Sequence, residues 1–234
     1  MLRVFEQCDC MEGMQKYKDI LTSRRVLAIV DPPYGINIAN NLAKNKGGAD
    51  SWKQHKNKTW DNTRPDAEYF NIVKELSTNQ IIFGANYFVY NLPSITKGWI
   101  IWDKVNHSLT MSDAEIIYSS FNCKTRIYQE NFGSERGVLS FLGDIHPTQK
   151  STMLYKWLLE NYSKDHDLIL DTHVGSASSL IACEEFGIDY IGFELDEDYY
   201  RDAKNRLEKA RFIRENKTAE ECYVNDLALF KDAI

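Results

Sequence analysis

The chain has 234 residues, of which 43% are hydrophobic and 26% charged, with a net charge of −6; this is the composition of a globular protein rather than a disordered or fibrous one. The negative balance excludes a protein that coats nucleic acid by bulk charge alone, although it permits a local basic surface. No apolar run approaches the roughly 18–20 residues of a membrane span, residues 1–10 lack the apolar stretch of a secretion signal, and five scattered cysteines predict a reduced, cytoplasmic protein. Cys8 and Cys10 do not have a usual zinc spacing, so no metal site is expected. The lack of a long apolar run means that no membrane contact is expected either.

Short apolar runs alternate with amphipathic segments along the chain. In chain order, the expected strands are 3–7, 26–30, 80–84, 98–102, 114–118, 167–171 and 190–194. Helical periodicity predicts helices over 152–163, 176–186 and 195–211. Because most strands are continuously apolar, we expect them to be buried on both faces of a largely parallel sheet. The pattern predicts a doubly wound α/β fold in a single domain, 1–234.

Two irregular segments interrupt this rhythm. Residues 35–64 contain six Lys and Arg residues against two Asp, and residues 122–150 contain three glycines without a clear period. Long irregular segments in a compact domain are usually functional or mobile. The whole negative excess lies in residues 184–234, so the rest of the chain can still bind an anionic partner. The apolar residues of 218–230 would suit packing on the body of the protein or on a second subunit in a homodimer.

The second half of the chain contains the pattern of a nucleoside half-site. The strand 167–171 is followed by a turn with Gly175 and a helix, and the next strand ends at Glu194, 23 residues after Asp171. An acid at this spacing accepts hydrogen bonds from ribose hydroxyls. The turn lacks G-x-G-x-x-G and the chain lacks a phosphate-binding loop, so the pattern favours a nucleoside without phosphates, such as S-adenosylmethionine. Taken alone, a glycine turn between strand and helix is also common structural punctuation.

The tetrapeptide Asp31-Pro32-Pro33-Tyr34 follows directly after the apolar strand 26–30. Two prolines end the strand and stiffen the backbone, which presents Asp31 and Tyr34 at the carboxyl end, where open α/β sheets bind ligands. Asp31 and the Pro32 carbonyl can each accept a hydrogen bond from an exocyclic amine, and Tyr34 offers a face for base stacking. The plainer interpretation is a strand-terminating turn with a packed tyrosine. All four residues together, beside a nucleoside half-site, favour the catalytic one.

These motifs resemble the S-adenosylmethionine-dependent DNA amino-methyltransferases, which methylate adenine N6 or cytosine N4. Asp31-Pro-Pro-Tyr34 resembles their catalytic motif, and Asp171-Thr-His-Val-Gly-Ser176 their cofactor loop. Further segments resemble the rest of the family pattern: Gln7-Cys-Asp-Cys10, Gly84-Ala-Asn-Tyr-Phe88, Gly98-Trp-Ile-Ile-Trp102, His146-Pro-Thr-Gln-Lys150 and Gly192-Phe-Glu-Leu-Asp196. The catalytic motif precedes the cofactor loop, which is the order of the permuted β group. The resemblance implies a Rossmann-like, seven-stranded methyltransferase sheet with circularly permuted motifs.

The resemblance also implies roles for individual residues. The catalytic set is Asp31, Pro32, Pro33 and Tyr34. The cofactor-binding set is Asp9, Cys10, Asp31, His146, Thr148, Gln149, Lys150, Asp171, His173, Gly175, Ser176, Ala177, Glu194 and Leu195. The chain departs from the family at His173, where Phe is usual, at Ala177, where a second Gly is usual, and at Ser151, where Pro is usual. We expect cofactor binding to be retained.

DNA is the partner that the resemblance implies. We expect contacts from the inserted segments 35–64 and 122–145, with five phosphate-binding candidates: Lys53, Lys56, Lys58, Arg126 and Arg136. For each single lysine, a solvated surface charge is the more common role. The leading hypothesis is a DNA adenine-N6 methyltransferase, because family members that act on cytosine N4 more often carry Ser in place of Asp31. Three alternatives stay open: cytosine-N4 methylation, a catalytically weak DNA-binding or regulatory subunit, and methylation of RNA or of protein glutamine.

Overall fold

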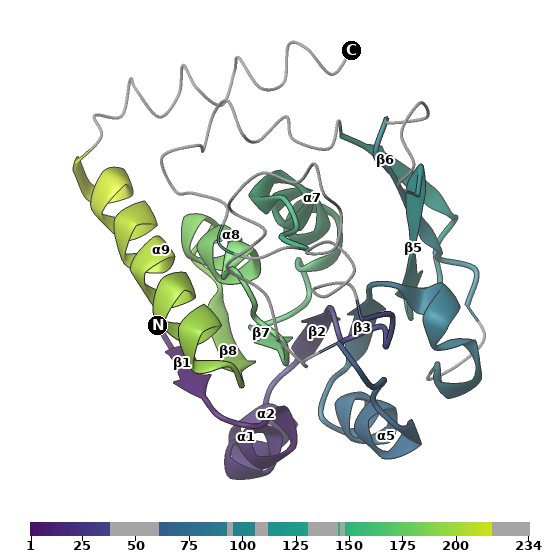
Figure 1. The fold of residues 1–234 in the computed structure, drawn as a ribbon, viewed down its shortest axis with the longest axis horizontal. Helices are drawn as coiled ribbons and strands as arrows, with labels where there is room; N and C mark the ends of the chain where they lie inside the picture. Colours follow the sequence, from purple (N-terminus) through teal and green to yellow (C-terminus); the bar gives the residue numbers. More distant parts are fainter. Residues whose placement is uncertain (38–60, 93–95, 106–111, 131–144, 146–147, 217–234) are drawn as a thin grey trace.

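The computed structural model describes residues 1–37, 61–92, 96–105, 112–130, 145 and 148–216 and shows a sheet with helices on both faces (Figure 1). The described strands are β1 (Arg3–Gln7), β2 (Val26–Val30), β3 (Asn79–Ile82), β4 (Ile100–Asp103), β5 (Ala114–Ser119), β6 (Arg126–Gln129), β7 (Leu168–Asp171) and β8 (Asp189–Glu194). The described helices are α1 (Cys10–Lys16), α2 (Lys18–Thr22), α5 (Ala67–Glu75), α7 (Thr152–Tyr162), α8 (Ser178–Phe186) and α9 (Glu197–Asn216), with the short 3₁₀ turns η1 (Ala85–Tyr87) and η2 (Val89–Asn91).

The strand order across the sheet is β1-β8-β7-β2-β3-β5-β4-β6. The first five strands are parallel, β5 runs antiparallel to both β3 and β4, and β6 runs parallel to β4. The expected α/β class and the largely parallel sheet are therefore confirmed. The sheet has eight described strands rather than the expected seven, because β6 lies within the segment 122–145 that we expected to be irregular.

Two layers of helices cover the sheet. Helices α7, α8 and α9 lie on one face, and α1, α2 and α5 lie on the other (Figure 1). Side chains of β2 alternate between the two cores: Leu27 and Ile29 pack toward α7 and α8, whereas Val26, Ala28 and Val30 pack toward α1 and α5. All five residues of β2 are buried, which explains why the strand is continuously apolar. The central strands therefore lie between two layers of helices.

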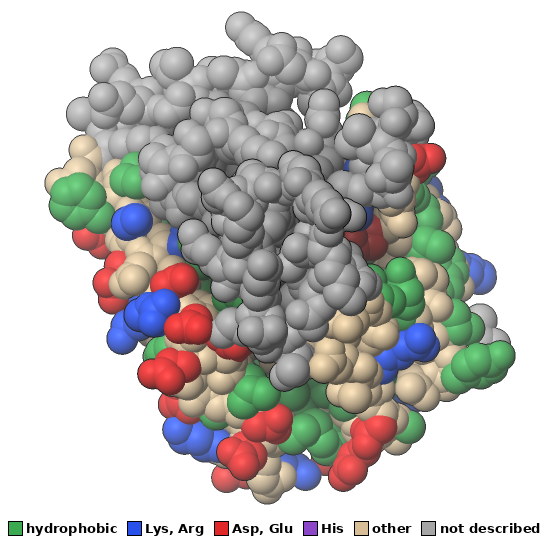
Figure 2. All heavy atoms as spheres, in the orientation of Figure 1, with side chains coloured by type: hydrophobic (Ala, Val, Ile, Leu, Met, Phe, Trp, Pro, Cys, Tyr) green, Lys and Arg blue, Asp and Glu red, His purple; other side chains and the backbone are tan. Residues whose placement is uncertain are grey.

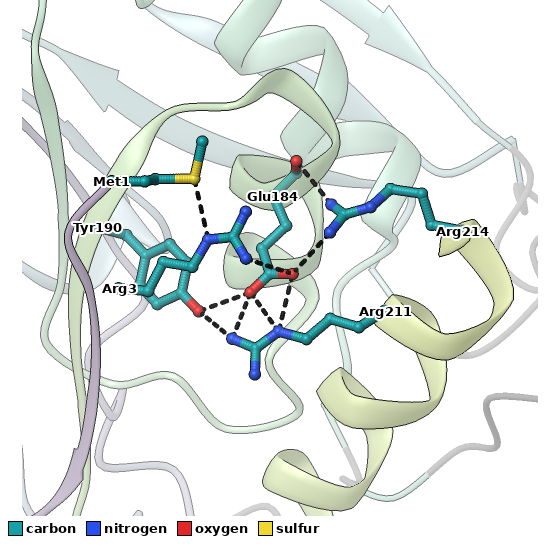
Figure 3. Close-up of polar contacts among 6 residues, drawn as sticks. All are labelled: Met1, Arg3, Glu184, Tyr190, Arg211 and Arg214. Atoms are coloured by element: carbon teal, nitrogen blue, oxygen red, sulfur yellow. Dashed lines mark hydrogen bonds and ion pairs between the residues drawn. The ribbon is translucent and has the colours of Figure 1, made fainter. Parts of the chain in front are cut away.

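A buried carboxylate fastens the two ends of the described chain to each other (Figure 3). Glu184 of α8 accepts hydrogen bonds from Arg211 of α9 at 2.7 and 2.9 Å and from the Tyr190 hydroxyl at 2.9 Å. Arg3 of β1 and Arg214 of α9 pair with the same carboxylate at 3.8 and 3.5 Å. Burial raises the pKa of Glu184, but the bonds from Arg211 and Tyr190 outweigh it and leave the pKa below its usual range.

The outward side of α9 carries charged side chains of both signs (Figure 2). Its buried stripe is formed by Tyr199, Ala203, Arg206 and Leu207, at the three- and four-residue spacing of an amphipathic helix. Among the described residues, no helix is both long and apolar enough to cross a bilayer.

Candidate active site

The carboxyl end of β2 presents the predicted catalytic residues. Asp31 follows the last residue of β2, and both of its carboxylate oxygens have partners within the protein. Its Oδ1 accepts a hydrogen bond from the Tyr34 hydroxyl at 2.6 Å, and its Oδ2 pairs with the Lys150 ammonium at 2.8 Å. Lys150 lies just before α7, so the structure brings together two motifs that are more than a hundred residues apart in the sequence.

Two further charged residues complete this cluster, and the sequence analysis did not include them. Glu115 of β5 lies with its Oε1 2.7 Å from the Tyr34 hydroxyl and 3.2 Å from Lys150 Nζ. Its Oε2 lies 3.2 Å from the Nζ of Lys104, which follows β4. The side chains of Glu115 and Lys104 are only 10% and 12% exposed, which makes this a buried network of two carboxylates and two ammonium groups. The signal that could have indicated Glu115 is an acid inside an otherwise apolar strand.

The network separates the proton affinities of its two carboxylates. Burial raises the pKa of Asp31, and the nearby Glu115 charge adds to this, while Lys150 opposes it; the net shift is upward. Burial also raises the pKa of Glu115, but Lys150 and Lys104 outweigh it and the net shift is downward. Desolvation lowers the pKa of Lys150, yet the two carboxylates more than compensate and raise it. Two carboxylates with pKa values shifted in opposite directions are typical of a site that moves protons.

The Tyr34 ring is fixed from several directions. It stacks on Tyr87 with the ring centroids 4.9 Å apart and an interplanar angle of 12°. Arg64 links the backbone on either side, since its Nε donates to the Tyr34 carbonyl at 3.0 Å and its guanidinium donates to the Tyr87 carbonyl at 3.2 Å. A Cβ at Gly84, whose φ is +60°, would lie 2.3 Å from the ring. Only glycine at position 84 leaves room for Tyr34.

The predicted nucleoside half-site lies at the ends of β7 and β8. Glu194 accepts hydrogen bonds from the backbone N–H groups of Gly175, at 2.8 Å, and Asp196, at 2.9 Å. A carboxylate has about four lone-pair positions, so Glu194 keeps acceptor capacity for a hydroxyl donor beyond its backbone partners. Asp171 lies deeper, 1% exposed, and braces the loop by accepting from the His173 N–H and the Ser179 hydroxyl. Burial raises the pKa of Asp171 to about 7.

An arginine of α9 stabilises the turn between β7 and α8. Ala177, where the methyltransferases that the sequence resembles usually have glycine, adopts a left-handed conformation with φ +63° at the start of α8. Ser176 and Ser178 lie on either side of it, and Arg206 of α9 donates to the Ser176 carbonyl at 2.8 Å and to the Ser178 hydroxyl at 3.0 Å. Arg206 is 2% exposed, so its guanidinium is buried with these partners rather than open to solvent.

His173 packs under the same edge. Its Nδ1 lies 2.9 Å from the Thr172 hydroxyl, its Nε2 lies 4.0 Å from Cys10 Sγ, and its ring contacts Tyr69 edge-on. Burial lowers the pKa of His173 to about 4, so the ring is neutral near pH 7. Burial raises the pKa of Cys10 to about 12, so its sulfur is a thiol. The histidine therefore acts as a flat, uncharged ring, as an aromatic residue would.

Asp9 and Leu195 lie at the neighbouring strand ends. Asp9 is the N-cap of α1, and its Oδ1 accepts from the Met11 N–H at 2.8 Å. Leu195 follows Glu194 and is 65% exposed, an apolar side chain open to solvent beside a half-buried acid. Gln149 accepts from the Ile145 N–H at 3.2 Å and so braces the segment that leads to Lys150. Thr148, the remaining described residue of that motif, is half-buried.

The sheet register brings these strand ends side by side. Residue Gln7 of β1 pairs with Glu194 of β8, and Asp171 of β7 pairs with Gly192 of β8. β7 in turn pairs with β2, which leads into Asp31. Four adjacent parallel strands therefore end at one edge, and each is followed by or ends in an acid.

The structure places only part of the predicted DNA-binding set. Arg126 begins β6, donates to Asn161 at 3.1 Å and lies over the Trp157 ring at 5.9 Å from its centroid, so its guanidinium packs on α7. Lys53, Lys56, Lys58, Arg136 and His146 lie outside the described residues, as does the C-terminal run 218–230. Their roles, and the homodimer, stay predictions.

Comparison with known proteins identifies relatives of this chain. The family model described as DNA methylase, of the N6/N4 type, matches residues 99–205. The putative methylase YubD of Escherichia coli K12 is 37% identical over 62 residues, which is 26% of this chain and 27% of that protein. Type II methyltransferase M.HinfI of Haemophilus influenzae is 26% identical, with 87% of this chain and 67% of that protein covered. The match to YubD thus spans about a quarter of that relative's length.

Solved structures confirm the fold. The M1.HpyAVI–SAM complex superposes with a TM-score of 0.54 at 20% identity, covering 88% of this chain and 99% of that one. PvuII DNA methyltransferase, which is cytosine-N4-specific, has a TM-score of 0.54 at 12% identity and covers 91% of both chains. At these identities the likeness shows a shared Rossmann-like fold. The chain thus combines a sequence match to DNA methylases with their architecture.

Proposed function

We propose that this chain, a relative of the N6/N4 DNA methylases in sequence and fold, is an S-adenosylmethionine-dependent DNA methyltransferase that acts on adenine N6. One observation carries the proposal: β2, β7 and β8 are neighbours in one sheet, so the corner with Asp31 and Tyr34 and the half-site with Glu194 share an edge. A methyl donor bound at the half-site would lie next to a group that can hold an amine. Holding two reactants side by side is worth roughly 7–11 kcal/mol of the barrier.

The residues at this edge fit the chemistry of S-adenosylmethionine. Glu194 has lone pairs left for ribose hydroxyls, and Leu195 offers an exposed apolar surface for the adenine ring. The turn at Gly175 is short and has no phosphate cradle, and this cofactor carries no phosphate. When bound, the cofactor supplies an electrophilic methyl group on a sulfonium. Asp9, Asp171 and Glu194 give the edge an acidic character, which suits a cationic ligand.

Asp31 and Pro32 would hold the target amine. The carboxylate and the Pro32 carbonyl each accept one N–H hydrogen, which turns the nitrogen lone pair away from conjugation with the ring. Tyr34 and Tyr87 provide stacked aromatic surface next to that position. The amine of a paired base is out of reach, so the base must rotate out of the duplex, at a cost of a few kcal/mol. DNA contacts from segments 35–64 and 122–145 remain part of this proposal on sequence grounds.

Methylation of mixed-sequence DNA tests the function. Purified protein is incubated with radiolabelled S-adenosylmethionine and DNA, RNA or protein, and modified nucleosides are then separated. We expect label in DNA only, as N6-methyladenine. Label found solely as 4-methylcytosine would move the protein to the specificity of the PvuII enzyme, and label in RNA or protein would overturn the DNA assignment.

A regulatory subunit without activity is the main competitor from a different class. Calorimetric titration with S-adenosylmethionine distinguishes the two, because the catalytic interpretation requires saturable binding. A Glu194→Ala variant provides the matched comparison, since the loss of the ribose-binding carboxylate should weaken that binding. Absence of binding heat in the unaltered protein would favour the regulatory alternative.

A further inference from the structure

The buried network raises a question about how Asp31 can receive substrate. Both of its oxygens are already engaged, Oδ1 by the Tyr34 hydroxyl and Oδ2 by Lys150. An incoming amine must compete with these donors for the carboxylate. Moving either donor into a place without an acceptor would leave a buried polar group unsatisfied, at a cost of about 1–3 kcal/mol.

Glu115 is placed to take over both donors. Its Oε1 lies 2.7 Å from the Tyr34 hydroxyl, almost the same distance as Asp31 Oδ1, and 3.2 Å from Lys150 Nζ. A phenol has one hydrogen to donate. The Tyr34 hydrogen can therefore point at Asp31 or at Glu115, with no movement of heavy atoms and no acceptor lost.

Lys104 keeps Glu115 in the ionised form. Its ammonium lies 3.2 Å from Glu115 Oε2 and also faces the Trp102 ring at 4.9 Å. Each carboxylate therefore has an ammonium partner, since Lys104 pairs with Glu115 while Lys150 bridges both acids. The pKa shifts agree with this division, with Glu115 lowered and Asp31 raised. Glu115 stays a charged acceptor, and Asp31 is the stronger proton acceptor of the two.

We propose that Glu115 is a positioning residue for the methyl transfer: it accepts the Tyr34 hydrogen bond and holds Lys150 when the target amine binds Asp31. Because this role rests on the proposed function, it adds a step to that chemistry. The nitrogen forms a bond to the methyl group as the bond from that carbon to the sulfonium sulfur breaks and leaves a thioether. The nitrogen then carries one proton too many. That proton passes to Asp31 Oδ1, which is free to accept it because the Tyr34 O–H now points at Glu115. The proton is then released to water when the product leaves.

Two substitutions of Glu115 test the role in the full-length protein. Glu115→Leu removes the alternative acceptor, so Tyr34 and Lys150 remain on Asp31; we expect kcat to fall by about 100-fold, the range of general acid–base effects. Glu115→Gln keeps a neutral acceptor oxygen and should recover about tenfold of that loss. The KM values for DNA and S-adenosylmethionine should stay within about twofold in both, because neither ligand touches Glu115 in this account.

Asp189→Asn is the matched control. Asp189 is a half-buried carboxylate at the start of β8 that accepts hydrogen bonds from the Arg24 guanidinium and the Leu2 N–H, both at 2.8 Å. It lies at the opposite end of β8 from Glu194 and outside the network around Asp31, so we expect kcat to be unchanged. If Glu115→Leu unfolds, Glu115→Gln decides alone. An unaltered kcat in the folded Glu115→Gln protein would overturn the role.

A titration without cofactor or DNA provides a second measurement. The charged and titratable groups that interact with Asp31 are Glu115 of β5, Lys150, Tyr34, Tyr69 of α5, Asp171 of β7 and Tyr155 of α7. Loss of the Glu115 charge removes an interaction that raises the Asp31 pKa, while Lys150 continues to lower it. Carboxyl ¹³C NMR, with Asp31→Asn to identify the signal, should therefore show a lower Asp31 pKa in Glu115→Gln than in wild type.

The two failures can be told apart. Wild-type protein that transfers no methyl group to any nucleic acid defeats the proposed function, whatever Glu115 does. If wild-type protein is active, a folded Glu115→Gln protein of equal kcat defeats the positioning role, and an unshifted Asp31 titration in that variant does the same. Either result leaves the proposed function standing.

Discussion

Gly84→Ala is a small substitution that should displace Tyr34. The added Cβ would lie 2.3 Å from Tyr34 Cε1 and 2.4 Å from Cζ. Carbon atoms pack at about 3.5–4.0 Å, so the ring has to withdraw by more than about 1 Å. The hydroxyl's hydrogen bond to Asp31 or Glu115 and the stack on Tyr87 both oppose this withdrawal.

Both the rate and the stability should change. A displacement of about 1 Å can cost roughly 100-fold in rate, which is our expectation for single-turnover methyl transfer. Overpacking costs about 1–3 kcal/mol, and alanine at a left-handed position adds about 1–2 kcal/mol. The expected loss of about 2–5 kcal/mol is measured by denaturant unfolding, with the rate measured well below the melting temperature of the variant.

Gly187→Ala is the control for backbone strain. Gly187 has a φ of +67°, and its added Cβ would meet only Met1 Cε at 3.8 Å. It should lose about 1–2 kcal/mol from the left-handed conformation and keep the wild-type rate. A Gly84→Ala protein that is folded and transfers methyl groups as fast as Gly187→Ala would refute the placement of Tyr34 at the reacting amine.

Two further substitutions test the supports of the fold and of the loop. Glu184→Gln removes the carboxylate that four partners share, and should lower the free energy of unfolding at pH 7 by about 2–4 kcal/mol, since breaking a buried ion pair costs about 3–5 kcal/mol. The folded-state pKa of Glu184 is depressed, so the stabilisation that its charge provides is present above the ordinary carboxyl pKa of 4.5 and is lost as the pH falls through the folded-state pKa. The unfolding free energies of wild type and variant should therefore converge at acidic pH. A difference that persists there would contradict the ion-pair explanation. Arg206→Met leaves the Ser176 carbonyl without its charged donor. In calorimetric titration we expect S-adenosylmethionine binding to weaken about tenfold, or about 1.4 kcal/mol. An unchanged affinity would show that the loop keeps its shape without Arg206.

The elements that the sequence predicted best are those whose pattern follows from burial on both faces. The runs at 26–30 and 190–194 are apolar because each lies between two helical layers, and the structure has strands at Val26–Val30 and Asp189–Glu194. Proline and glycine marked where the chain leaves the sheet. Local signals of this kind were sufficient to locate Asp31 and Glu194 at the ends of two strands that only β7 separates.

Short elements at the edges left weaker signals. β6 has four residues with alternating half-buried and exposed side chains, so nothing continuous marks it within the segment 122–145. Helix α1 has seven residues and buries only Gly13 and Met14, which gives too few positions for a visible period. Its N-cap explains Asp9: the acid that we predicted to contact a ligand also binds the first N–H groups of a helix, a use that the sequence does not distinguish.

The network around Asp31 depends on contacts between distant residues. Glu115 is 81 positions from Tyr34 and 35 from Lys150, and no local spacing relates them. Antiparallel pairing of β5 with β3 and β4 brings Glu115 to the carboxyl edge. Lys150 was predicted from its motif to bind the cofactor, and the structure shows its ammonium on Asp31 and Glu115. Which partners a charged residue has is settled by the tertiary fold.

Asp31→Ala provides the most direct test of the claim that this corner holds the amine beside the methyl donor. Label transfer from S-adenosylmethionine to DNA is measured in one turnover for wild type and variant, and cofactor affinity is measured by calorimetry on the same preparations. We expect transfer to be abolished while the cofactor Kd stays within about tenfold, or about 1.4 kcal/mol. A variant that still methylates DNA at the wild-type rate would contradict the account.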